Sequence, residues 1–154
     1  MEVDIQHFHE QLDGIPDADR ASLVYQTENF TARYLDEKGG YMEIDKANVR
    51  LYVPPGAIKQ LRMIYIRLEP GINGNVQGKV SPVVEVGPPG TTFMKRVTLS
   101  YPHCAVNESE WRFTTLICES NANSWKDIAK DDGVECSVKN GRVIIKFATI
   151  GEQT

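Results

Sequence analysis

Two short stretches of the chain bring together side chains that often do chemistry. His7-Phe8-His9-Glu10 offers three groups that can bind a metal ion, and His103-Cys104 sets a base beside a thiol. Helix residues two apart do not share a face, and no further His or Cys accompanies the first stretch, so we expect a solvated helix face rather than a zinc site. A catalytic Cys–His pair needs a third group that orients the base, and nothing identifies one here. We expect His103 to be a structural residue at a strand end.

No other stretch matches a catalytic or cofactor-binding motif. The chain lacks a Walker loop, a dinucleotide fingerprint and a nucleophile elbow. Asp17, Asp19, Asp131 and Asp132 do not have the spacing of a calcium loop and are typical of turns and caps. The glycine-rich segment 71–78 lacks the Lys-Ser/Thr that follows a phosphate cradle. We therefore expect a protein that is not an enzyme, has no cofactor or metal ion, and takes no small-molecule substrate.

The length and charge of the chain limit its number of domains and its possible kinds of partner. At 154 residues the chain fits one domain, which can bury a core without a metal ion or disulfide staples. Its net charge is −4 and its Lys and Arg residues form no cluster in the sequence, so we expect no nucleic-acid partner. No run approaches the roughly 20 apolar residues of a membrane span, so we expect membrane contact only indirectly, through the parent protein.

The cysteines and the N-terminus bear on the cellular compartment. Cys104, Cys118 and Cys136 are an odd and widely spaced set without a Cys-x-x-Cys pair, which is typical of a reducing cytosol. The start of the chain lacks the basic and apolar regions of a signal peptide. Glycosylation-type tripeptides at Asn29 and Asn107 keep a secreted protein as the minor alternative. We expect a cytoplasmic protein, with the inner face of the plasma membrane and cell junctions as candidate positions.

The elements that would position any site are mostly short strands. After residue 19, runs of β-branched and aromatic residues alternate with Gly, Pro and Asn, and apolar residues recur with a period of two. We predict strands near residues 23–25, 30–34, 49–53, 63–68, 82–86, 97–101, 111–118 and 143–147. Asn140-Gly141 predicts a tight hairpin. The sequence therefore predicts an all-β fold, an antiparallel β-sandwich that forms one domain over residues 20–152.

Helical periodicity is confined to the N-terminus. Three apolar residues share one helical stripe, at Ile5, Phe8 and Leu12. Gly14 and Pro16 end the pattern, so we predict a short helix within a leader of residues 1–19. This helix is either a docking or regulatory element, or a leader that packs on the domain or frays, because short helices are marginal alone. We expect residues 1–18 to be dispensable for the β fold.

Four stretches in order resemble the ZU-five domain, the module shared by zonula occludens scaffolds, UNC-five netrin receptors, ankyrins and some death-domain proteins. The first is Gly39-Gly40 followed by the run 49–53 and Pro54-Pro55-Gly56-Ala57, and the second is 81–84 running into Gly87-Pro88-Pro89-Gly90 and Phe93. The third is Val97-Thr98-Leu99 before Pro102-His103-Cys104, and the fourth is Trp125-Lys126-Asp127 after a polar turn. The resemblance spans about residues 30–150, and four motifs in order make it fairly specific.

Two positions depart from the family pattern. Val86 stands where the family often has Cys, and Arg96 stands where it often has Pro before the third motif. Neither change threatens the fold, and both leave the subfamily open. The resemblance implies a β-sandwich that serves as a protein-interaction or intramolecular clamp module in larger cytoplasmic scaffolds, adaptors or receptor tails. The resemblance also implies that this chain is a fragment, because family members usually continue into a related second β-module and a death domain, or end a long scaffold.

The leading hypothesis is a non-catalytic binding module whose partners are other proteins or adjacent domains of its own parent chain. An extended partner segment can add to an exposed sheet edge, where backbone hydrogen bonds give affinity and side-chain pockets give selectivity. We place the candidate surface near the runs 49–58 and 64–68, with apolar contact residues Val49, Leu51, Val53, Ile64 and Ile66. The motif residues are structural candidates: Gly39, Gly40, Pro54, Pro55, Gly56, Gly87, Pro88, Gly90 and Trp125.

Self-cleavage is the rival hypothesis, because some family members cut themselves at a His-Phe-Ser near the last strand. An N-to-O acyl shift needs a hydroxyl or thiol on the residue after the scissile bond. Aligning Phe147 with the family's Phe puts Lys146 in the place of its His and Ala148 in the place of its Ser, so the nucleophile is missing. Lipid binding is a third hypothesis, which the net charge and the lack of a basic loop disfavour.

Overall fold

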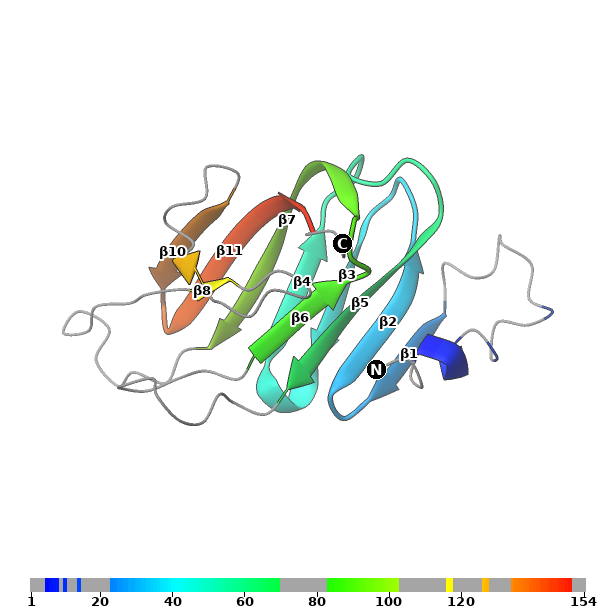
Figure 1. The fold of residues 1–154 in the computed structure, drawn as a ribbon, viewed down its shortest axis with the longest axis horizontal. Coiled ribbons are helices and arrows are strands. Elements are labelled where there is room, and N and C mark those ends of the chain that lie inside the picture. Colours follow the sequence, from blue (N-terminus) through cyan, green and yellow to red (C-terminus); the bar gives the residue numbers. More distant parts are fainter. Residues whose placement is uncertain are drawn as a thin grey trace.

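The structure of the protein is a computed structural model that describes residues 5–8, 10, 14, 23–69, 83–102, 116–117, 126–127 and 134–150. Its elements (Figure 1) are β1 (Val24–Thr27), β2 (Phe30–Leu35), β3 (Gly40–Ile44), the 3-10 turn η1 (Asp45–Ala47), β4 (Val49–Val53), β5 (Arg62–Glu69), β6 (Val83–Gly87), β7 (Thr92–Pro102), β8 (Leu116–Ile117), β9 (Lys126–Asp127), β10 (Glu135–Lys139) and β11 (Arg142–Thr149). Residues 5–8 and 10 are helical, so the short N-terminal helix predicted from the sequence is confirmed.

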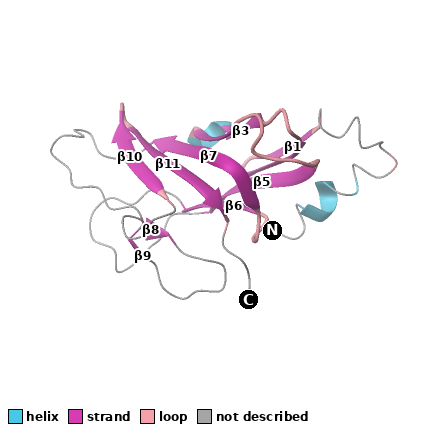
Figure 2. Ribbon diagram, turned by 90° about the horizontal axis from the view of Figure 1, so that it is seen from above, coloured by secondary structure: helices cyan, strands magenta, loops and turns pink. Residues whose placement is uncertain are grey.

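The long strands form two antiparallel sheets that pack face to face. One sheet has the order β1-β2-β5-β6, and the other has the order β10-β11-β7-β4-β3. Figure 2 shows the two layers from above, with β3 and β7 in one and β5 and β6 in the other. The pairings between the described strands are all antiparallel, including the short pair of β8 with β9. The predicted all-β antiparallel sandwich is therefore confirmed.

The alternation of side chains explains which face of each strand is buried. In β4, Val49, Leu51 and Val53 are buried while Arg50 and Tyr52 are exposed, as the period of two requires. The same alternation in other strands, together with Ala57 and Ile58 from the segment between β4 and β5, produces one core between the sheets. It is formed by Leu35, Met42, Ile44, Val49, Leu51, Val53, Ala57, Ile58, Ile64, Ile66, Phe93, Val97, Leu99, Val143, Ile145 and Phe147. Removing this apolar surface from water is the main force that holds the sheets together.

A second, smaller apolar cluster covers the outer face of the four-stranded sheet. Phe8 of the N-terminal helix is 1% exposed, and its ring centroid lies 5.9 Å from that of Tyr25 and 5.7 Å from that of Tyr34. Phe30 and Tyr65 continue the cluster as a stacked pair with centroids 5.7 Å apart. Within the leader, Phe8 and Ile5 of the described helical residues therefore pack on the domain. Both faces of β5 are buried, whereas its sequence pattern indicates one apolar face.

Two turns depend on residues with positive φ. Asn140 (φ 53°) and Gly141 (φ 80°) join β10 to β11, so the hairpin predicted from Asn-Gly is confirmed. Gly39 (φ 74°) precedes β3, and its amide donates to the Asp36 carbonyl at 2.9 Å. A Cβ at this position would lie 2.8 Å from the Pro54 carbonyl oxygen, so the turn accepts only glycine without moving the backbone.

Parts of the fold differ from the sequence prediction. The pattern does not predict β3, because a glycine pair is typical of a turn and hides the alternation of the buried Met42 and Ile44. The strand β7 begins at Thr92, well before the predicted run 97–101. Of the predicted strand 111–118 the structure describes only β8, and the remainder lies outside the described residues.

Candidate functional site

The five apolar residues predicted to contact a partner lie in the core. Val49, Leu51 and Val53 of β4 are at most 2% exposed, and Ile64 and Ile66 of β5 are 0% exposed. Their side chains hold the sheets together and present no surface to another molecule. A partner at these strands would instead meet the side chains between them. Binding near β4 stays a prediction, and it rests on the outward-facing residues.

Two large exposed aromatic side chains lie on the outer side of β3 and β4. Tyr41 and Tyr52 are 45% and 47% exposed, and they are directly opposite each other in the antiparallel pair. Arg33 donates a hydrogen bond to the Tyr41 carbonyl, which therefore points away from β4 and makes this a non-hydrogen-bonded pair with closely spaced side chains. Tyrosine is enriched at the centres of protein interfaces, so this pair is the strongest candidate anchor for a partner.

The outer face of the five-stranded sheet also concentrates positive charge, and we call it the basic face. Alternation and register place on it the basic residues Arg50, Arg96, Lys139, Arg142 and Lys146 and the acidic residues Glu43 and Glu135. The chain as a whole has a net charge of −4. The basic excess is therefore a local property of this face, produced by the strand order.

Two arginines of the basic face, Arg50 of β4 and Arg142 of β11, lie on the strands that flank Ser100 of β7. Ser100 of β7 lies opposite Arg50 of β4. Arg142 of β11 donates to the Ser100 hydroxyl (Nε to Oγ, 2.6 Å), to the Ser100 carbonyl (3.1 Å) and to the Asn48 carbonyl (2.7 Å), so its guanidinium crosses β7 toward β4. Burial, and after it the positive charge of Arg50, lowers the pKa of Arg142 from its ordinary value. The two guanidinium groups form a cationic site that a carboxylate would complement.

Acidic residues balance the basic face only in part. Arg50 Nε is 4.0 Å from Glu43 Oε2, and Arg96 Nη1 is 3.4 Å from Glu135 Oε2, with all four side chains at least 40% exposed. A hydrogen bond with Asp45 raises the pKa of Glu43 above its ordinary value, against the opposing charge of Arg50. Exposed ion pairs of this kind contribute little to stability, so a partner can replace them at small cost.

The edge of the five-stranded sheet at β3 is occupied by side chains of the other sheet. Arg33 donates to the Tyr41 carbonyl at 3.0 Å, and Thr31 and Gln26 donate to the Glu43 carbonyl at 2.9 and 3.3 Å. These are carbonyls that an added strand would use as acceptors. A partner strand at β3 would have to displace all three donors, so strand addition is disfavoured at this edge.

The first family-type motif lies where two turns pack together. The Gly56 amide donates to the Glu37 carbonyl at 2.8 Å, and Gly39 lies against the backbone of Pro54. The turn that precedes β3 is thereby joined to the turn that follows β4. The motif residues at this junction are Gly39, Gly40, Pro54, Pro55 and Gly56. They shape the backbone at one end of the β3–β4 pair.

The second motif, Gly87-Pro88-Pro89-Gly90, connects β6 to β7 and meets the last strand. The Gly90 amide donates to the Ile150 carbonyl at 3.1 Å, and the Ile150 amide donates to the Thr91 carbonyl at 2.8 Å. The buried Thr91 hydroxyl donates to the Pro88 carbonyl at 2.7 Å. Gly87 lies opposite Tyr65, where a Cβ would overlap the ring. Trp125, the remaining motif residue, lies outside the described residues.

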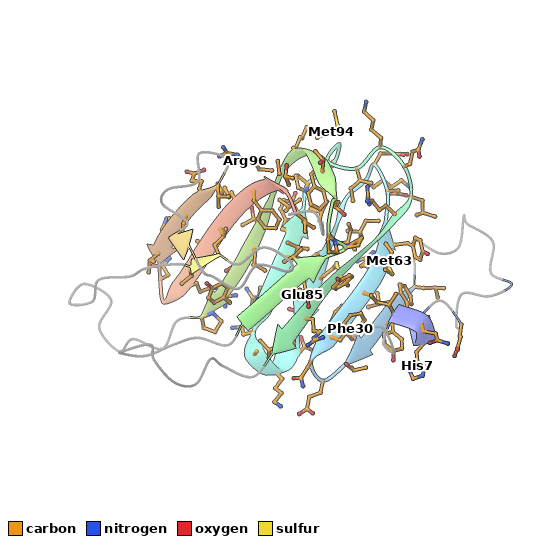
Figure 3. The ribbon with its side chains drawn as sticks, viewed as in Figure 1. His7, Phe30, Met63, Glu85, Met94 and Arg96 are labelled. Atoms are coloured by element: carbon orange, nitrogen blue, oxygen red, sulfur yellow. The ribbon has the colours of Figure 1, made fainter. Side chains whose placement is uncertain are left out.

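The residues considered for chemistry do not come together in the described part of the chain. His7 is exposed on the N-terminal helix (Figure 3), and His9, His103 and Cys104 lie outside the described residues. Among the residues with a described position, no group of three or more His, Cys, Asp or Glu side chains could hold a metal ion. None of the described helical residues belongs to a helix long and apolar enough to cross a membrane.

A shallow hollow of about 390 Å³ lies between the β1–β2 turn and η1. Lys46 Nζ and Glu28 Oε1 form an exposed ion pair at its side, 2.7 Å apart, and this hydrogen bond lowers the pKa of Glu28. Two other lining side chains, Gln26 and Thr31, donate to the Glu43 backbone. The hollow is open and its polar groups serve the fold, so we assign it no ligand.

The last strand is irregular at the position where a self-cleavage motif would lie. The strand β11 pairs with β7 in register as far as Phe147 opposite Val97, and the register shifts before Thr149 opposite Thr92. Ala148 lies in this bulge. A distorted backbone is present there, but the residue after Phe147 carries a methyl group instead of a hydroxyl.

Neither Tyr41 nor Tyr52 is among the contact residues predicted from the sequence. Tyr52 alternates with the apolar residues of the run 49–53, so the rule that successive strand side chains point to opposite faces could have identified it. Tyr41 requires knowledge of the β3–β4 register, which no local pattern supplies.

Two packed antiparallel sheets and turns built from these motifs define the class of the chain as an antiparallel β-sandwich domain. The family model of the ZU5 domain matches residues 31–119, and the chain belongs to this family. The resemblance drawn from four motifs in the sequence is thereby confirmed.

The chain is also similar to individual known proteins. The UNC5C-like protein of mouse (Mus musculus) is 30% identical over 130 residues, which cover 79% of this chain and 25% of that protein. The chain thus spans about a quarter of the length of this relative. Among solved structures, the full extracellular region of zebrafish Gpr126/Adgrg6 is similar with a TM-score of 0.48 and 12% identity, over 82% of this chain and 22% of that chain.

Proposed function

We propose that the chain is a non-catalytic interaction module of a cytoplasmic scaffold, adaptor or receptor tail, which docks partner proteins or adjacent domains of its own parent chain in signalling. Membership of the ZU5 family and the UNC5C-like relative support a protein-interaction module in general. The observation that carries the proposal is the exposed pair Tyr41 and Tyr52 on the outer side of β3 and β4.

The position of the pair indicates how a partner would dock. The backbone groups of β4 are used on both sides, by β3 and by β7, and the β3 edge is occupied by donors from β1 and β2. A partner therefore meets side chains rather than a free strand edge. Two adjacent tyrosines supply rigid apolar area with hydroxyls that can hydrogen bond, at a low cost in side-chain entropy.

The test is proximity labelling in cultured cells with the chain fused to a labelling enzyme. Wild type is compared with Tyr41→Ser/Tyr52→Ser, and the control is Val24→Ser, which removes an exposed apolar side chain (48% exposed) from the other sheet. We expect cytoplasmic and junctional proteins that label equally with wild type and control, and several-fold less with the double variant. Circular dichroism verifies that all three chains are folded.

Two results would contradict the proposal. If the double variant labels the same proteins to the same extent as wild type, the tyrosine pair is not the docking surface. If the labelled proteins come from the secretory pathway, the cytoplasmic assignment is wrong. Intact-mass measurement of a labelled partner after incubation with the chain checks the non-catalytic part, because an enzyme would leave a cleaved or modified product.

A further inference from the structure

We infer that the basic face binds a Glu/Asp-rich segment of a partner protein, with Arg50 and Arg142 as the carboxylate site and the Tyr41–Tyr52 pair as the aromatic anchor. The inference rests on the proposed function and specifies the chemistry of the partner. It follows from the charge of the face, from the way the two arginines are held, and from the backbone bonds already made beneath them.

The charge of the basic face supports an acidic partner. The basic face has five basic and two acidic side chains, named above, on a chain whose net charge is −4. The rest of the sequence therefore has a net charge of −7 (−4 minus +3), which opposes binding of the same segment elsewhere on the chain. Complementary charge of this kind speeds association and orients the partner, and like charge elsewhere suppresses binding at wrong positions.

The arrangement of Arg50 and Arg142 also supports binding of a carboxylate. Three hydrogen bonds to Ser100 and Asn48 fix the Arg142 guanidinium before any partner arrives, so little side-chain entropy is lost on binding. The Arg50 side chain is 46% exposed, and its Nε lies 4.0 Å from Glu43 Oε2, beyond hydrogen-bond distance. An incoming carboxylate can therefore take the place of Glu43 and bond to both guanidinium groups.

The two tyrosines extend this site along β4. Tyr52 is two residues from Arg50 on the same face, and Tyr41 lies beside Tyr52 across the strand pair. A segment that places a carboxylate over Arg50 would therefore pass over the tyrosine rings within a few residues. Because interior strands support the site, the segment docks through side chains and leaves the sheet unchanged.

Other occupants fit the face less well. A second copy docked face to face would set two basic faces against each other, which like charge opposes. An anionic membrane would attract the arginines, but Glu43 and Glu135 lie among them, and Ile144, the aliphatic residue in the middle of the face, is half-buried.

The probe is a fluorescein-labelled peptide of twelve residues that alternates glutamate and serine, followed by fluorescence anisotropy at 50 and 200 mM NaCl. The controls are a lysine–serine peptide and a single-stranded DNA of equal length. We expect the glutamate peptide to bind, to weaken several-fold at the higher salt, and to bind more tightly than either control. No detectable binding of the glutamate peptide, or tighter binding of DNA, overturns the inference.

A pair of matched variants locates the site. Arg50→Ala/Lys146→Ala removes two exposed charges from the basic face, and Lys59→Ala/Arg62→Ala removes two exposed charges elsewhere, so both variants have the same net charge. We expect about tenfold weaker peptide binding for the first variant and less than about twofold change for the second. Equal weakening would show that net charge and not this face binds the peptide. In the wild type, amide shifts on peptide addition should centre on Tyr41, Tyr52 and Ser100.

Two measurements address the other occupants. Sedimentation with vesicles containing 30% phosphatidylserine should leave the chain in solution, and binding to them that Arg50→Ala/Lys146→Ala abolishes would replace the protein segment with a lipid surface. Light scattering should show a monomer, and a dimer that the same variant dissociates would make the face an interface between copies.

The two proposals can fail separately. If the glutamate peptide does not bind but Tyr41→Ser/Tyr52→Ser still abolishes labelling in cells, the partner chemistry is wrong and the interaction function stands. If the peptide binds at the basic face but the tyrosine variant labels like wild type, the carboxylate-binding site stands and the proposed tyrosine anchor fails.

Discussion

Replacing Phe8 with alanine should destabilise the domain without abolishing its fold. Phe8 is 1% exposed, and the Tyr25 and Tyr34 rings lie 5.9 and 5.7 Å away. Truncating a buried Phe usually costs about 3–5 kcal/mol, and aromatic pairs contribute roughly 0.5–1.5 kcal/mol beyond burial. Without the Phe8 ring the helix can detach from the sheet. The loss of stability therefore cannot exceed the free energy that packing of the helix on the sheet contributes. We therefore expect the free energy of unfolding to fall by about 2–4 kcal/mol.

Urea unfolding followed by far-ultraviolet circular dichroism measures this loss. With a slope of about 2–3 kcal/mol/M, the midpoint should fall by roughly 1–2 M. The control is Gln6→Ala on the same helix, where the side chain is exposed and donates to Glu10, so its effect should stay within about 0.5 kcal/mol. A chain that starts at residue 19 should unfold cooperatively, with about the same stability as Phe8→Ala.

Either of two results would refute this reasoning. If Phe8→Ala is as stable as Gln6→Ala, the ring does not pack on the four-stranded sheet. If the truncated chain has no near-ultraviolet dichroism, the leader is part of the core and is not dispensable for the fold, contrary to the expectation from its small apolar content.

Burial raises the pKa of Tyr65 to about 12, so stability present below its ordinary value near 10 should be lost as the pH rises toward 12, by roughly 2–3 kcal/mol. Tyr65→Phe should flatten this part of the urea-stability profile, and an unchanged slope would assign the loss to other groups. Gly39→Ala should destabilise the domain by about 1–3 kcal/mol more than Gly141→Ala, because both positions have positive φ but only at Gly39 does a Cβ meet backbone atoms. Equal midpoints in thermal unfolding would contradict the clash. The purified chain should remain one species of 17.3 kDa for days at neutral pH, because Ala148 has no nucleophile. A fragment ending at Phe147 in intact-mass spectra, formed despite protease inhibitors, would contradict it.

A strand could be predicted from the sequence where its apolar alternation corresponds to one buried face and one solvent-exposed face. In the runs 49–53 and 143–147 one face meets the core and the other meets water, so alternation identifies both the strand and its buried side. Asn140-Gly141 identifies its hairpin because few dipeptides accept two successive positive φ values. The strand β3 is missed because its partner β4 stabilises it after a glycine pair that alone indicates a turn.

The candidate site could not be predicted in the same way. An apolar strand residue in a domain of this size is needed first by the core, so Val49 and Ile64 were better core candidates than contact residues. The basic face combines Arg50, Arg96 and Arg142, which are far apart in sequence and stand among acidic or apolar residues. The strand order β11-β7-β4 brings these arginines together, and no cluster of basic residues in the sequence indicates the basic face.

The two outer faces of the sandwich therefore have separate roles, and their independence can be measured. The four-stranded sheet buries its apolar outer face under the N-terminal helix, while the five-stranded sheet presents charge and the tyrosine pair to solvent. Phe8 and Arg50 share no contact and lie on opposite sides of the core, so their substitutions should have additive effects on stability, within about 0.5 kcal/mol. For the same reason Phe8→Ala should leave the affinity of the glutamate peptide unchanged. An affinity that fell with Phe8→Ala in a still-folded chain would mean that the helix controls the basic face through the packed core between them.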